Sequence, residues 1–189
     1  MVFNHKLTND EKNYGWGPVF MHWLMAFAII GLYPLGWYIE TLDYYDPAYK
    51  TVPVWHKSIG ILVAMTLLLR IVWRIFNKPP AALPQPAPLL FVAKMAHGLL
   101  YLLVLFTVIS GYLISTADGR AIEFFNLFSI PALPIGIGNQ EDIAGKIHFI
   151  VATSLILLAG LHAAAALKHH FIDKDSTLKR MLALREETE

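Results

Sequence analysis

The segment KIHFIVATSLILLAGLHAAAALKHH, residues 146–170, is apolar enough to form a transmembrane helix, yet it carries two histidines in its apolar body. About 20 apolar residues in an α-helix cross the ~30 Å of bilayer hydrocarbon. His148 and His162 are fourteen residues apart, which corresponds to nearly four helical turns and about 21 Å of rise. We therefore expect both imidazoles on one helix face, near opposite ends, where ionisable side chains indicate function.

The composition is that of a membrane protein. Of 189 residues, 56% are hydrophobic and 15% are charged, against about 45–50% and about 25% in soluble domains. The absence of cysteine excludes disulfides, iron–sulfur clusters and thiolate metal sites. The first apolar run is too long for a signal-peptide core and lacks a small-residue cleavage site, so we expect it to be a retained helix.

Four apolar runs predict an all-α integral membrane four-helix bundle, organised as a single domain over residues 1–189. The predicted helices lie at about 18–39, 55–76, 91–114 and 144–168. The connector NKPPAALPQPAPLL (residues 77–90) is too rich in proline to be helical through its middle. The loop at 115–143 carries aromatic residues, so we expect it on the membrane surface or capping the bundle.

The distribution of basic residues predicts the orientation. One side carries Lys6, Lys12, Arg74, Lys78, Lys94, Lys168, Lys174, Lys179, Arg180 and Arg185. The other side carries Lys50, Lys57, Arg120 and Lys146. The positive-inside rule then places both termini in the cytoplasm and the opposite loops in the periplasm, across a bacterial inner membrane. The periplasmic loops carry the acids Glu40, Asp43, Asp46, Asp118, Glu123, Glu141 and Asp142.

Two further histidines match those of the last helix in depth. His22 lies near the cytoplasmic start of the first helix, level with His162, and His56 lies at the periplasmic start of the second, level with His148. Two imidazoles from different helices can hold one haem iron, whereas zinc prefers three or four ligands. Two haems ligated in this way leave iron no open position, which favours electron transfer. The alternative is four isolated hydrogen-bonding histidines near helix ends.

Four basic residues lie near the predicted ligands. Arg70 shares the helix face of His56 at the cytoplasmic level, and Arg74 follows one turn later. Both are candidates for haem propionates, and snorkelling at a helix end is the alternative. Lys57 and Lys146 are candidates for propionate or anionic-substrate contacts, or simply for solvated helix ends.

Three further histidines lie within or directly after the predicted helices. His97 has no partner at a matching position, so we expect a hydrogen-bonding or quinone-site role rather than ligation. His169 and His170 lie at the cytoplasmic interface, where a quinone headgroup needs a donor. Five glycines, which helix packing explains equally well, are candidates for close approach of a helix or a porphyrin: Gly31, Gly60, Gly98, Gly111 and Gly160.

The chain resembles the bacterial cytochrome b561 family over nearly its whole length. The motifs are HW (22–23), WHKSIGILV (55–63), RIVWR (70–74), AHGLLYLLV (96–104), SGYLISTADG (110–119) and LHAAAALKHHFIDKDSTLKRM (161–181). The resemblance implies two haems b, with ligands matching His22, His56, His148 and His162. It also implies electron exchange with a membrane quinone, with His169 near the quinone, and for characterised members oxidation of periplasmic superoxide.

The expected function is therefore electron transfer between a periplasmic donor, superoxide or a protein, and ubiquinone or another quinone. In its enzyme form the protein would be a superoxide:quinone oxidoreductase; the sequence leaves open whether it is an enzyme. The alternative is a haem b membrane anchor and electron conduit for a larger dehydrogenase or hydrogenase-like complex. A haem-free membrane protein such as a transporter is the third reading. No nucleic-acid partner is expected.

Overall fold

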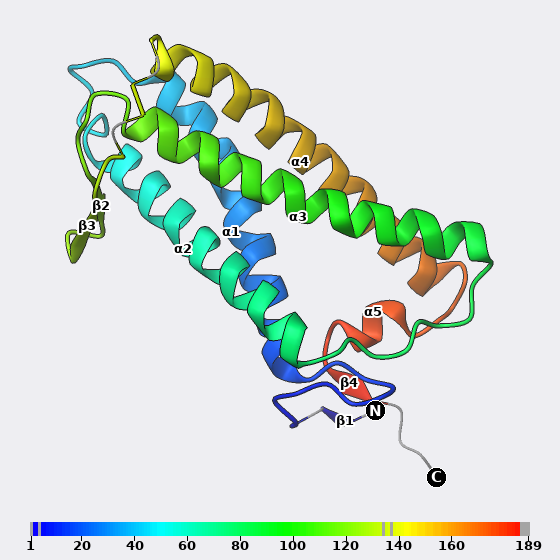
Figure 1. Cartoon of the computed structure of the whole chain (residues 1–189). Coiled ribbons are helices and arrows are strands. Elements are labelled where there is room, and N and C mark those ends of the chain that lie inside the picture. The colour runs from blue at the N-terminus through cyan, green and yellow to red at the C-terminus, as the bar shows by residue number, and fades with distance from the viewer. Residues whose placement is uncertain (1, 4, 134, 137, 186–189) are drawn as a thin grey trace.

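Four long helices form the body of the protein (Figure 1). The computed structural model describes residues 2–3, 5–133, 135–136 and 138–185. The long helices are α1 (Trp16–Thr41), α2 (Thr51–Phe76), α3 (Ala87–Ser115) and α4 (Gln140–Phe171). Each of them is long and apolar enough to cross a membrane, which confirms the predicted class of an all-α, membrane-spanning bundle.

The observed helices are longer than the predicted apolar spans. Helix α2 begins at Thr51 instead of about residue 55, and α4 begins at Gln140 instead of about residue 144. Apolar runs reveal only the part of a helix that suits hydrocarbon, whereas the first turn of α4 contains Glu141 and Asp142. Acidic side chains stabilise a helix N-terminus, so this polar turn remains helical.

The bundle has two distinct ends. Helix α3 runs beside α4, and α1 packs on α2 (Figure 1). Because the chain crosses the bundle four times, the N- and C-terminal segments meet at one end, together with the α2–α3 connector. We call this the terminal end. The opposite end, which carries the α1–α2 and α3–α4 loops, is called the hairpin end.

A small apolar core lies between the helices at mid-height. It is formed by Met25, Val63, Leu67, Val104 and Leu155. Many leucine, isoleucine and phenylalanine side chains point outward and are exposed. Such an outer surface suits lipid, since a bilayer solvates apolar side chains while the helices satisfy their own backbone groups.

The α3–α4 loop caps the hairpin end. Capping the bundle was one of the two positions that the sequence predicted for this loop. Its short strands, β2 (Ile122–Phe124) and β3 (Phe128–Ile130), form an antiparallel hairpin that the sequence pattern did not predict. The fully buried Ser58 of α2 fixes this hairpin. Its Oγ accepts the backbone N–H of Phe125 at 3.0 Å and donates to the Glu123 carbonyl at 3.4 Å.

Segments far apart in sequence pair and hydrogen-bond with one another at the terminal end. The elements there are β1 (Val2–Phe3), α5 (Thr177–Arg180) and β4 (Leu184–Arg185), with β1 and β4 paired antiparallel. The Trp23 indole of α1 donates to the Met181 carbonyl at 2.7 Å. The buried Arg180 donates to the Ala81 carbonyl in the α2–α3 connector at 3.0 Å. This end is therefore closed by backbone-directed hydrogen bonds.

We predict that the bundle depends on Leu67, which is 2% exposed in the core. Leu67→Ala should cost about 2–5 kcal/mol in the free energy of unfolding, because it removes buried methyl groups and leaves a cavity. Leu68→Ala is the matched control, since Leu68 is 61% exposed on the outer surface. Equal losses for the two variants in SDS-induced unfolding would contradict this core.

Candidate functional site

Four histidines form two pairs at the two ends of the bundle. At the hairpin end, the ring centroids of His56 and His148 lie 6.3 Å apart, with the planes inclined by 65°. At the terminal end, those of His22 and His162 also lie 6.3 Å apart, with planes inclined by 74°. Each pair joins α4 to a different helix, α2 in the first case and α1 in the second.

This separation suits two imidazoles on opposite sides of one metal ion. With metal–nitrogen bonds of about 2.0–2.1 Å and a further ~1.1 Å from each nitrogen to its ring centre, the centroids of such a pair lie about 6.3 Å apart. Among the described residues, neither pair belongs to a cluster of three or more candidate metal-binding side chains. Such two-ligand sites fit an iron whose other four ligands come from a porphyrin, and they do not fit tetrahedral zinc.

Helix α3 orients the ring of His148. The Nδ1 atom lies 3.0 Å from the Thr107 carbonyl oxygen and 3.1 Å from Ser110 Oγ. The Ser110 hydroxyl donates its own proton to the Phe106 carbonyl at 2.7 Å, so its lone pairs face the imidazole. Both neighbours of Nδ1 are thus acceptors, and Nδ1 carries the ring proton. The Nε2 atom is left with a lone pair for a metal.

Two glycines make room for the rings at the hairpin end. A Cβ at Gly111 would lie 3.1 Å from His148 Cε1, and one at Gly36 would lie 3.3 Å from His56 Cε1. Both distances are tighter than ordinary carbon contacts, so a side chain at either position would push on an imidazole. Of the five glycines considered from sequence, only Gly111 contacts a histidine in this way, and Gly36 was not among them.

The terminal-end pair has two close neighbours. Arg70 Nη1 donates to His22 Nδ1 at 3.2 Å, and the guanidinium lies over the Tyr101 ring. His97, which was expected to have no partner at its depth, lies beside His162 with centroids 5.3 Å apart. That separation is shorter than a pair bridged by one metal requires. Arg74, one turn beyond Arg70, interacts electrostatically with His97.

An apolar layer separates the two pairs. Leu155 is 3% exposed and lies midway along α4, seven residues from both His148 and His162. Val63 is similarly buried on α2, seven residues from His56. Seven residues are almost two full turns, so these side chains share the face of the histidines. These apolar side chains therefore separate the two histidine pairs.

Basic side chains surround two clefts at the hairpin end. One cleft of about 380 Å³ is lined by Lys50, Lys57 and Arg120, and a neighbouring one of about 300 Å³ is also lined by Lys57 and Arg120. The Arg120 guanidinium pairs with Asp118, and its hydrogen bonds lower the pKa of that carboxyl. Lys146 is exposed on α4 and lines neither cleft.

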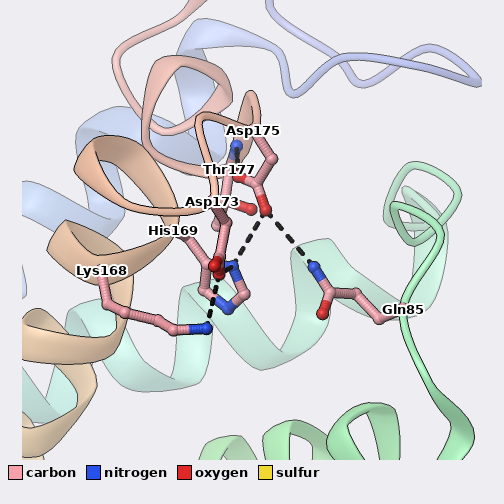
Figure 2. A network of polar contacts seen from close by, with 6 residues as sticks. All are labelled: Gln85, Lys168, His169, Asp173, Asp175 and Thr177. Carbon is pink, nitrogen blue, oxygen red and sulfur yellow. Dashed lines mark hydrogen bonds and ion pairs between the residues drawn. The ribbon is translucent and has the colours of Figure 1, made fainter.

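His169 belongs to a polar network at the C-terminus of α4 (Figure 2). Its Nδ1 lies 3.0 Å from Asp173 Oδ2 and 2.9 Å from Asp175 Oδ2. Lys168 Nζ pairs with Asp173 at 2.7 Å, and Gln85 of the α2–α3 connector donates to Asp175 at 3.4 Å.

Asp175 is the more firmly held of the two acids. Burial alone would raise its pKa, but hydrogen bonds from Thr177 and the contact with His169 lower the pKa of this carboxyl below its ordinary value. Sequence analysis singled out His169 but missed both acids. The i, i+4 spacing of His169 and Asp173 within HHFIDKD was the available signal.

Sequence comparisons place the chain among membrane cytochromes. The model of the prokaryotic cytochrome b561 family matches residues 13–183. Cytochrome b561 homolog 2 of Escherichia coli K12 is 48% identical over 176 residues, which cover 93% of this chain and 94% of that protein.

More distant relatives cover the same region. A protein of Yersinia pestis named probable superoxide oxidase CybB is 29% identical, with 91% of this chain and 97% of that protein covered. Cytochrome b562 of Cereibacter sphaeroides is 29% identical, with 93% and 99% covered. With its four membrane-spanning helices, the chain is thus a multi-pass bacterial membrane protein. It belongs to the prokaryotic cytochrome b561 family, whose members transfer electrons in membranes and bind haem b.

Proposed function

We propose that this protein carries electrons across the bacterial inner membrane, from a periplasmic donor to a quinone such as ubiquinone, through two haems b. The observation that carries the proposal is the pair of matched histidine–histidine separations, 6.3 Å at each end of the bundle. In this assignment the hairpin end faces the periplasm and the terminal end faces the cytoplasm, because the Lys and Arg residues concentrate at the terminal end.

The four histidines would hold the two haems. His56 and His148 would hold one haem iron, and His22 and His162 the other. When bound, the haems supply reversible one-electron chemistry. The Thr107 carbonyl and Ser110 Oγ keep the proton of His148 on Nδ1, so Nε2 remains available as the ligand. Two imidazoles per iron leave no position for oxygen, so these residues favour electron transfer over oxygen binding.

Arg70 is a candidate to form an ion pair with a haem propionate. Arginine has no acceptor, so Arg70 donates to His22 Nδ1, and the proton of His22 then lies on Nε2. If His22 binds the haem iron through Nε2, its ring proton must lie on Nδ1. A protonated Nδ1 cannot accept a hydrogen bond, so the Arg70 guanidinium has to move away. Arg70, with Arg74 one turn beyond, is then available to pair with propionates at the terminal end.

The clefts at the hairpin end suit a small anionic donor, and we propose superoxide. Each superoxide anion gives up one electron and leaves as molecular oxygen, so two anions and two protons convert one quinone to quinol. Lys57 and Arg120 line both clefts, and Lys57 follows the ligand His56 in sequence. This local positive charge lies in acidic surroundings, because the loops and helix ends on this side carry seven acids against four bases.

In this proposal the quinone binds at the terminal end. His169 lies at the C-terminal end of α4 and holds a ring nitrogen toward two carboxylates, which leaves its other nitrogen for a quinone oxygen. His97, beside the ligand His162, is the second candidate contact. A histidine suits this role because its ring can both donate and accept a hydrogen bond.

The haem content tests the central claim. We expect about two haems b per chain by pyridine haemochrome analysis, since there are two ligand pairs. His148→Ala should remove mainly the periplasmic haem and His162→Ala mainly the cytoplasmic one, because the two residues lie about 21 Å apart along α4. A wild-type value near zero would overturn the proposal. Loss of both haems from each folded variant would contradict two separate sites.

Gly111 provides a sharper test of the periplasmic pair. Gly111→Val should lower the haem content from about two towards one per chain, because its side chain would displace the His148 ring. Gly98→Val is the matched control on the same helix, since a Cβ at Gly98 meets nothing within 4 Å. Equal haem content in the two variants would show that close approach of α3 to His148 is not needed.

Lys57 should guide an anionic donor. Lys57→Gln is expected to slow superoxide-driven haem reduction about two- to fivefold at low ionic strength, with the difference shrinking as salt is added. Lys146→Gln, the control, should change the rate much less, because Lys146 lines neither cleft. Absence of superoxide-driven reduction in the wild type would favour the conduit role, in which a partner protein supplies electrons.

A further inference from the structure

Two carboxylates converge on one nitrogen of His169 (Figure 2). Asp173 Oδ2 and Asp175 Oδ2 lie 3.0 Å and 2.9 Å from Nδ1. Both oxygens lie close to Nδ1, although neither is aligned well enough with the ring to count as a hydrogen bond. Both acids come from the segment that directly follows α4, four and six residues after His169.

This arrangement fixes the tautomer of the imidazole. An unprotonated Nδ1 would direct a lone pair at two negatively charged oxygens, which is repulsive. A protonated Nδ1 attracts both oxygens, so the proton of neutral His169 lies on Nδ1 and the lone pair on Nε2. Carboxylate partners fix catalytic and metal-binding histidines in the same way.

The rest of the network holds the two acids in place. Asp175 accepts the backbone N–H of Thr177 at 2.8 Å and the Gln85 amide at 3.4 Å. Asp173 is neutralised by the Lys168 ammonium at 2.7 Å. In the part of the chain that the structure describes, the two acids are the charged groups that contact this imidazole, and Lys168 balances one of them. The nitrogen and the two oxygens are close enough for a metal ion to bridge, but Lys168 already supplies the cation.

We propose that Asp173 and Asp175 are positioning residues that keep His169 in the Nδ1-protonated tautomer, so that Nε2 exchanges a proton with the quinone oxygen. This inference rests on the proposed function. In quinol oxidation, one quinol O–H bond breaks as an Nε2–H bond forms, the second quinol proton goes to water, and two electrons leave toward the haems of the proposed function. In quinone reduction, two electrons arrive and the imidazolium Nε2–H provides one of the two protons, the other coming from water.

The test compares carboxylates with amides of the same shape. In Asp173→Asn/Asp175→Asn, an amide N–H can donate to Nδ1 and stabilise the wrong tautomer. We expect oxidation of the pre-reduced, haem-loaded protein by a short-chain ubiquinone analogue to slow by about 10- to 100-fold, the range for partners that orient a histidine. Asp173→Glu/Asp175→Glu should restore much of the rate. Asp142→Asn, at the opposite end of α4, is the control.

Two further readouts separate positioning from damage to the fold. Reduction of the same variants by dithionite should be unchanged, because it bypasses the quinone. Nitrogen NMR of the reduced, diamagnetic wild type should show the His169 proton on Nδ1, and in the double Asn variant on Nε2. A wild-type proton on Nε2 would overturn the inference.

The outcomes also distinguish this inference from the proposed function. If His169→Ala loses quinone-linked oxidation but the double Asn variant keeps the wild-type rate, the positioning role is wrong and the quinone site stands. If the loaded wild type is not oxidised by quinone at all, the proposed quinone function is wrong, and the positioning role falls with it.

Discussion

The fourteen-residue spacing of His148 and His162 on α4 is the constraint on which the other helices depend. It places two imidazoles on one face at two depths, with the buried Leu155 midway between them. Each imidazole then needs a partner at its own depth from a helix on that face. An up-and-down bundle can provide this when α1 carries a histidine near one end and α2 carries one near the other, as His22 and His56 do.

An imidazole in an apolar bundle is costly unless its polar atoms are satisfied, and α3 shows how this is achieved. The Thr107 carbonyl, which faces His148 Nδ1, lies one helical turn before Gly111. Only a residue without a side chain at 111 lets the ring approach that carbonyl, since a Cβ there would lie 3.1 Å from the ring. Gly111 therefore makes possible the polar contact that satisfies His148 Nδ1.

Much of the fold followed from hydropathy, because long apolar runs and a proline-rich connector are local properties of the chain. The relative depths of the histidines could also be predicted from their spacing in the sequence, because the rise per residue is fixed in a helix. The residues of neighbouring helices that contact the histidine rings could not be predicted in this way. Thr107, Ser110 and Gly36 reach the rings only because of how the helices rotate and pack. The β2–β3 hairpin was missed for a related reason, as its position depends on Ser58, more than sixty residues away in sequence.

The two ends of the bundle differ in the way that the proposed chemistry requires. Oxidation of a small anion needs only access and positive charge, and the hairpin end has open clefts lined by Lys57 and Arg120. Reduction of a quinone consumes protons, and the terminal end carries His169 between two acids, one of them paired with a lysine. The apolar layer around Leu155 lies between these two ends in the bundle core. In the proposed function, electrons would cross this layer between the two haems, and quinone reduction would take up its protons at the terminal end.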